Sequence, residues 1–350
     1  MKNTRTHKVL MLLFLITVVL PTVFLILVGT FFYHKKPANF TDEISFGVTF
    51  SHIFATDLKL NWQKVYLEML DDLNPEFLRL PVYWSEIEKK EGELDFSDYD
   101  FMVTEADKRE VKLTLVVGTK VPRWPECHVP LWAKELSETE RQRSLMMAVG
   151  KTVERYEGVP SLYAWQVENE PFLPFFGECP PINSQNLDSE IALVKILDKG
   201  VHPIIVTDSG ELSIWLPAAK RADIFGTTMY RIVWSRNFSK YLGYIKYPIT
   251  PKFFWLKANL VEFFYPDKKI IVSELQAEPW ANEGLEKLSR EEQGKTMNIE
   301  KFKDNIEFVK DVGFSEAYLW GVEWWYWMRE KNDNPEYWQV AKEVFSENRF

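Results

Sequence analysis

The sequence has few cysteines and no excess of positive charge. Only two Cys occur in 350 residues, too few for a disulfide scaffold or a four-Cys zinc site. The net charge is −9, which argues against a nucleic-acid partner because phosphate neutralisation needs a basic surface. His52, His128 and His202 are too scattered to suggest a metal site, and no Gly-rich dinucleotide fingerprint follows any predicted strand. We therefore predict neither a metal nor a cofactor.

Aromatic residues are abundant in an otherwise ordinary composition. Hydrophobic residues make up 46% and charged residues 27% of the chain, which excludes general disorder. Aromatic residues reach 15%, with 14 Trp. Rings stack on the C–H faces of sugars, so Trp residues after predicted strands are candidates for a carbohydrate-binding rim. These residues are Trp84, Trp124, Trp132 and Trp280, with a further cluster at Trp324, Trp325 and Trp327 that could instead form an aromatic belt near a membrane.

The amino-terminal part contains a long uncharged run. Val9 to Tyr33 is 25 residues without a charge, and as a helix it would be roughly 37 Å long, enough to span a ~30 Å hydrocarbon core. A cleavable signal peptide has a shorter apolar region of ~7–15 residues and a small-residue cleavage site. We predict an uncleaved transmembrane anchor over residues 1–36. The weak site at 28–30 is the alternative, and its use would leave the protein secreted.

The charges around this run predict the orientation. Basic residues flank it on both sides, with a slight excess before it, which favours an amino terminus inside the cell. Residues 37–350 then lie on the extracytoplasmic side. They carry 37 basic and 51 acidic residues, a net charge of −14, which suits a neutral substrate better than an anionic one.

Short apolar runs alternate with helical patterns along residues 37–350. Between the third and fourth runs, for example, Leu145, Val149 and Val153 share one face of a predicted helix. Eight strand–helix units in a single domain of this length are typical of a (β/α)₈ barrel. The fifth unit is short, and the sixth carries an aromatic insert over residues 234–264. The eight predicted strands are Ile44–Thr49, Phe77–Val82, Val111–Val117, Leu162–Val167, Pro203–Thr207, Ile224–Met229, Lys269–Val272 and Glu316–Leu319.

Acidic residues stand where two of these strands end. The fourth strand runs into Glu168-Asn169-Glu170-Pro171, and the seventh into Ser273-Glu274, with Glu278 four residues later. In a barrel, catalytic groups sit at the carboxyl ends of strands. Two carboxyls are what glycosidic bond cleavage needs, one protonated to assist the leaving oxygen and one ionised. Glu168 and Glu278 leave each assignment open to a second acid.

The motifs at these strand ends resemble those of clan A glycoside hydrolases, the retaining (β/α)₈ superfamily that includes the cellulases. Asn169-Glu170-Pro171 and Val272-Ser273-Glu274 carry the resemblance, which runs from about residue 45 to 325. It implies that Glu170 is the acid/base and Glu274 the nucleophile. It further implies substrate-site roles for Arg79 beside the nucleophile, Asn169 on the sugar 2-hydroxyl, Tyr230 as a donor to the nucleophile and Trp320 beneath the sugar ring.

The resemblance predicts a membrane-anchored retaining β-glycoside hydrolase that acts on a carbohydrate by double displacement. A barrel that binds a glycan without cleaving it, and a transglycosylase that uses the same two Glu, are the alternatives. Cys127 and Cys179 fall in loops that follow neighbouring strands, on a domain that faces an oxidising compartment. We predict a disulfide between them.

Overall fold

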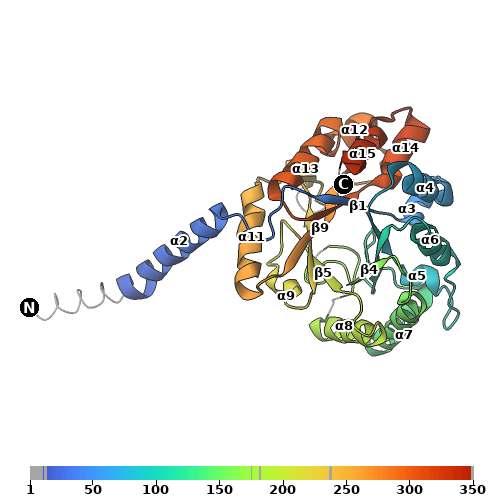
Figure 1. Ribbon diagram of the computed structural model, residues 1–350, viewed down its shortest axis with the longest axis horizontal. Coiled ribbons are helices and arrows are strands. Elements are labelled where there is room, and N and C mark those ends of the chain that lie inside the picture. The colour runs from blue at the N-terminus through green and yellow to red at the C-terminus, as the bar shows by residue number, and fades with distance from the viewer. Residues whose placement is uncertain (1–10, 12–13, 175, 181–182, 236–238, 348–350) are drawn as a thin grey trace, which may run out of the picture.

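Eight parallel strands close into a barrel in the computed structural model, which describes residues 11, 14–174, 176–180, 183–235 and 239–347 (Figure 1). The strand order around the barrel is β1-β10-β9-β6-β5-β4-β3-β2, and the predicted (β/α)₈ fold is confirmed. The barrel strands are β1 (Ser45–Thr49), β2 (Phe77–Pro81), β3 (Lys112–Val117), β4 (Leu162–Val167), β5 (Ile204–Asp208), β6 (Ile224–Met229), β9 (Lys269–Gln276) and β10 (Glu316–Trp320).

Helices surround the barrel as an outer ring (Figure 1). The fifth unit has only the four-residue α9, and the insert of the sixth contains the antiparallel pair β7 (Ile232–Val233) and β8 (Ile245–Lys246). The helices of the barrel domain are α3 (His52–Asp57), α4 (Trp62–Glu68), α5 (Trp84–Ile87), α6 (Ser97–Asp107), α7 (Glu138–Tyr156), α8 (Ser184–Leu197), α9 (Leu216–Ala219), α10 (Ser239–Leu242), α11 (Pro251–Phe264), α12 (Arg290–Thr296), α13 (Ile299–Val312), α14 (Val322–Asn332) and α15 (Glu336–Glu347), with short π and 3₁₀ turns at Met69–Leu73, Leu131–Ala133 and Leu285–Lys287.

The barrel interior has an apolar layer at one end. A separate buried cluster there consists of Phe77, Ala164, Ile205, Ile224, Ile271 and Tyr318. Side chains two residues apart on a strand point to the same face, so the position two residues beyond each of these faces the interior nearer the carboxyl end. Those positions include Arg79, Gln166 and Thr207, all buried and polar. One end of the barrel is therefore packed, and the other carries the polar groups of the site.

Several tryptophans are core residues, which corrects part of the predicted rim. Trp324 and Trp325 are 0% exposed, and their indole N–H groups donate to Gln293 Oε1 and Ala277 O at 2.9 and 2.7 Å. They form neither a sugar rim nor a membrane belt, because α14 turns this face toward the barrel. Buried Trp84 packs edge-on against Trp132 at 5.8 Å. Trp327 is half-buried and also packs against the core.

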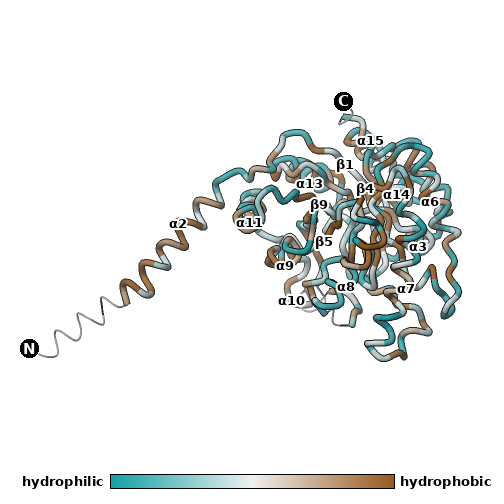
Figure 2. Tube along the Cα trace, turned by 60° about the horizontal axis from the view of Figure 1, so that its bottom comes forward, coloured by the Kyte–Doolittle hydropathy of each residue, from teal (hydrophilic) through white to brown (hydrophobic). Residues whose placement is uncertain are grey.

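One apolar helix extends away from the barrel. A π-helical turn, η1 (Leu15–Val19), continues into α2 (Leu20–His34), and no residue of this described apolar span is buried. Figures 1 and 2 show α2 leaving the domain beside α11, and Figure 2 colours much of this helix as hydrophobic. By length and composition this helix can cross a membrane, a property that it shares with signal sequences.

The buried position of Trp325 predicts a large effect on stability. Trp325→Ala removes a fully buried ring and leaves Ala277 O without its donor, so the free energy of unfolding should fall by about 3–5 kcal/mol. Trp124→Ala is the matched control, because that ring is 55% exposed. Chemical denaturation of both variants measures the difference, and equal stabilities would contradict the core assignment.

Candidate active site

A register shift in β9 directs Glu274 into the barrel. Val272 pairs with Thr227 of β6, whereas Glu274 pairs with the next residue, Thr228. The pairing with β10 shifts at the same place. One extra residue, Ser273, is therefore accommodated as a bulge, which redirects the side chain that follows it. Unlike the predicted strand, which stops at Val272, β9 continues to Gln276, so Glu274 lies on a strand and not on a loop.

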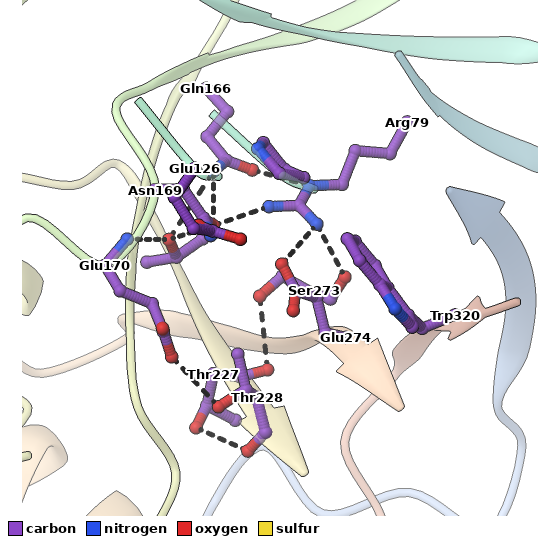
Figure 3. A network of polar contacts seen from close by, with 12 residues as sticks. Arg79, Glu126, Gln166, Asn169, Glu170, Thr227, Thr228, Ser273, Glu274 and Trp320 are labelled. Atoms are coloured by element: carbon purple, nitrogen blue, oxygen red, sulfur yellow. Dashed lines mark hydrogen bonds and ion pairs between the residues drawn. The ribbon is translucent and has the colours of Figure 1, made fainter. Parts of the chain in front are cut away.

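Two donors hold the Glu274 carboxylate. Arg79 Nη1 lies 2.9 Å from Oε1 (Figure 3), and Tyr230 Oη donates to Oε2 at 2.8 Å. Burial is the largest cause that raises the pKa of Tyr230 well above its usual value, and the Glu274 charge adds to it. The phenol therefore stays protonated as a donor. Arg79 and Glu274 are both buried, so their charges compensate each other out of water.

Glu170 faces the same space from the end of β4 (Figure 3). Its backbone adopts a left-handed φ of 44°, an unusual conformation for a non-glycine residue that often marks a functional site. Thr228 Oγ1 donates to its Oε1 at 3.1 Å. Burial raises the pKa of Glu170 well above its ordinary value, and the negative charge of Glu274 raises it further. This carboxyl therefore keeps its proton where a solvated glutamate has lost it.

The Asn169 amide is oriented by its neighbours. Its Oδ1 accepts from Arg79 Nη2 at 2.9 Å, Thr207 Oγ1 at 3.2 Å and Gln166 Nε2 at 3.3 Å. Its Nδ2 donates to Glu126 Oε2 at 3.0 Å. Because three donors occupy the oxygen, only the second N–H of Nδ2 is left to donate to a ligand.

Glu126 is a third acid in the site that the sequence analysis missed. Burial raises its pKa to about 7, and the charge of Glu274 contributes to the increase. It lies in the loop after β3, directly before Cys127, where no strand end or motif marks it. Only the convergence of the β3 and β4 loops brings it to Asn169.

Glu278 belongs to a different group of charges. Arg123 bonds to it through Nη1 and also donates to Glu323 Oε2 at 2.8 Å. Trp320 Nε1 donates to Glu278 Oε1 at 2.8 Å, and the Arg123 guanidinium lies 4.3 Å from the centre of the Trp320 ring. Figure 3 shows this ring beside Glu274. Glu278 therefore holds Trp320 and Arg123, whereas Glu274 is the acid that bonds to Arg79 and Tyr230.

Glu168 likewise bonds elsewhere, to the loop after β3 and to Glu190 of α8. Its carboxylate accepts from the backbone N–H groups of Thr119 and Lys120 at 2.7 and 2.6 Å. It occupies the space beside Gly118, whose φ is 134°, and a Cβ added there would lie 2.6 Å from the Glu168 carboxyl. Glu168 therefore ties the β4 end to the β3 loop, and Glu170 is the β4 acid that faces Glu274.

Rings and a disulfide connect the loops above these acids. Cys127 and Cys179 form a disulfide with a Cα–Cα distance of 5.1 Å, which joins the loops after β3 and β4. Phe176, in the second loop, contacts Trp124 and Trp280, with ring centres 6.4 and 5.4 Å away. Trp280 in turn meets Tyr230 edge-on at 4.9 Å. A row of contacting aromatic rings therefore extends from the exposed Trp124 to Tyr230, which donates a hydrogen bond to Glu274.

The site residues predicted from the sequence converge in the structure. Arg79, Asn169, Glu170, Tyr230 and Glu274 share one network at the carboxyl ends of the strands, with Trp320 beside it. Among the described residues, no group of three or more His, Cys, Asp or Glu side chains is arranged to hold a metal ion.

No protein-family model matches the sequence, and no curated protein matches it. Solved structures share its fold. A cold-adapted β-galactosidase from Rahnella aligns with a TM-score of 0.58 at 11% identity, over 89% of this chain and 56% of that one. A GH5_18 protein from Streptomyces cattleya, in complex with GlcNAc, aligns with a TM-score of 0.54 at 10% identity, over 79% of this chain and 70% of that one.

A GH5_18 variant from Bifidobacterium longum, in complex with Manβ1-4GlcNAc, gives a TM-score of 0.55 at 11% identity, over 79% of this chain and 68% of that one. The structural neighbours are thus glycoside hydrolases, and at these identities they establish the fold of this chain. The chain spans just over half the length of the β-galactosidase.

The Arg123 network predicts a stability effect that is separate from chemistry at Glu274. Arg123→Met leaves the buried carboxylates of Glu278 and Glu323 without their cation, which should cost about 3–5 kcal/mol of unfolding free energy. Arg155→Met is the control, since its ion pair with Asp100 is largely exposed and such pairs contribute about 0–1 kcal/mol. Denaturant unfolding compares the two variants, and similar losses would argue against this network.

Proposed function

We propose that this chain is a retaining β-glycoside hydrolase with Glu274 as nucleophile and Glu170 as acid/base. The observation that carries the proposal is the contrast between the two carboxyls. Glu274 is held by a guanidinium and a phenol, whereas burial and the nearby negative charge favour a proton on Glu170. Double displacement needs one ionised carboxyl and one protonated carboxyl, and the surroundings of Glu274 and Glu170 favour these two different states.

In the first step the Glu274 carboxylate attacks the anomeric carbon while Glu170 donates its proton to the departing oxygen. The glycosyl group is then bonded to Glu274 through an ester. In the second step Glu170, now ionised, takes a proton from water, and the water oxygen displaces Glu274 from the anomeric carbon. The free N–H of Asn169 donates to the sugar 2-hydroxyl, a contact that strengthens in the transition state.

The proposed substrates are β-linked neutral sugars. The neighbouring structures bear names of β-galactosidases or contain GlcNAc and Manβ1-4GlcNAc, which supports β-galactosides and β-mannosides as the first substrates to test. Glu126 adds a third carboxyl to a site that already contains Glu170 and Glu274. Such a site repels uronic acids and other anionic sugars.

The proposed location is the extracytoplasmic face of a membrane. The apolar span Leu15–His34 supports anchoring, and the disulfide between Cys127 and Cys179 is consistent with an oxidising compartment. The division into an anchor over residues 1–36 and a catalytic domain over 37–350 stays a prediction, as does retention of the anchor.

Substitution of Glu274 in β9 and of Glu278 in the loop that follows tests which acid is the nucleophile. Glu274→Gln should remain folded and lose turnover of an aryl β-glycoside by more than about 10³-fold, as expected when a nucleophile is removed. Glu278→Gln should keep most activity and lose about 1–3 kcal/mol of stability through its weakened bond to Arg123. Steady-state kinetics and thermal unfolding measure both. Full turnover by Glu274→Gln would exclude the proposed nucleophile.

The pH dependence of kcat/KM tests Glu170. The rate should fall as pH rises through the raised pKa of Glu170, because the proton donor is lost. Glu126→Gln keeps an acceptor for Asn169 but removes one of the negative charges that raise this pKa. The basic limb of the profile should then move to lower pH by roughly one unit, which corresponds to about 1.4 kcal/mol of lost repulsion.

Glu154→Gln, on the exposed face of α7, is the control for that experiment and should leave the profile in place. An unchanged basic limb in Glu126→Gln would show that Glu126 does not act on the proton donor.

The stereochemistry of the first product, followed by proton NMR, separately distinguishes retention from inversion.

A further inference from the structure

The carboxyl end of α2 is bonded to α11. Asn259 Nδ2 donates to the backbone carbonyls of Phe32 at 2.9 Å and Lys35 at 2.7 Å. These carbonyls lie at the end of α2, where the backbone has no further helical donors. Asn259 is only 2% exposed. A buried side chain of the barrel domain thus terminates the apolar helix.

Further contacts hold the same junction. Tyr33 Oη and Thr250 Oγ1 are 3.0 Å apart, and the Phe32 ring packs 6.3 Å from that of Phe263. Glu262 accepts from the backbone N–H of residue 38 at 3.1 Å and pairs with Lys35 at 3.8 Å. These contacts begin before α11 and extend to its last turn, so α2 and the segment after it contact the domain at more than one point.

Next to this junction, α11 has an apolar outer face. Phe263 and Phe264 are 68% and 53% exposed, and Leu256 and Leu260 are half-buried. Their spacing places these four residues on one side of the helix. We call them the α11 apolar face. It is continuous with the apolar helix through the Phe32–Phe263 contact, and Lys35 and Lys252 lie at its edge.

We propose that the α11 apolar face lies in the interfacial region of the bilayer that α2 spans. The bilayer is identified from the junction between α2 and α11, because the medium that surrounds the end of α2 also contacts Phe263 and Phe264. Aromatic rings favour the membrane interface, and lysines at its edge suit anionic headgroups. The negative charge of Glu262 is already paired with Lys35. This inference rests on the anchoring proposed above and is independent of the chemistry at Glu274.

The contact sets the direction in which the site opens. Figures 1 and 2 show α2 leaving the domain at its flank, beside α11 of the outer helical ring. If that flank lies against the bilayer, the barrel axis runs along the membrane. The carboxyl ends of the strands, with Glu170 and Glu274, then open sideways over the membrane surface and not directly away from it.

Photo-crosslinking from lipid tests the proposal. The full chain is placed in nanodiscs of phosphatidylcholine and phosphatidylglycerol that contain a lipid with a diazirine close to the headgroup, and the crosslinked peptides are identified by mass spectrometry. We expect crosslinks on α2 and on residues 256–264 of α11. We expect none on α8, although its Ile196 is 73% exposed, because that helix lies elsewhere on the ring (Figure 1).

Two variants and a control sharpen the test. Phe263→Ser combined with Phe264→Ser should abolish most crosslinks to α11 and keep those to α2, whereas Ile196→Ser should change neither. Asn259→Leu should reduce crosslinks to α11 by loosening the junction. Crosslinks to α2 with none to α11 in the unaltered chain would overturn the flank contact and leave the anchor intact. Absence of crosslinks to α2 as well would overturn the anchoring on which the proposal rests.

Discussion

A buried negative charge on Glu274 is the constraint around which the site is organised. Removed from water, a carboxylate is costly unless it is paired and hydrogen-bonded. Arg79 from β2 and Tyr230 after β6 meet that need, and Arg79 also holds Asn169. The same charge then raises the pKa of Glu170. One ionised group therefore determines how its neighbours are placed and which of them keeps a proton.

The barrel interior is divided into an apolar layer and a polar layer, and the polar layer surrounds the charge of Glu274. Phe77, Ala164 and Ile205 fill one end, and Arg79, Gln166 and Thr207, each two residues further along its strand, bring polar groups to the other. The bulge at Ser273 adds the Glu274 side chain to that polar layer. The second charged group, around Arg123, stabilises Trp320 through a guanidinium–ring contact and a hydrogen bond to Glu278. Stability and the proposed chemistry thus use different acids that lie close together in the sequence.

Local patterns were sufficient to predict the strands, because buried parallel strands are short apolar runs and helices repeat their apolar positions every three to four residues. They also placed acids at the ends of two strands, and the resemblance to clan A glycoside hydrolases selected Glu170 and Glu274 among them. They failed for Trp324 and Trp325, because the number of Trp residues after a strand does not show which face of the following helix packs against the core. Glu126 was missed because its position depends on how two loops meet.

The sequence by itself determined the barrel, its apolar amino-terminal run and the acids available at the strand ends, because each of these is encoded in neighbouring residues. Only the tertiary structure decided which acid faces which. Glu168 turns to the β3 loop and Glu278 to Arg123, while Glu170 and Glu274 share one space. The contact between α2 and α11 through Asn259 likewise became evident only in the tertiary structure. These outcomes depend on contacts between residues distant in the chain, which no local pattern records.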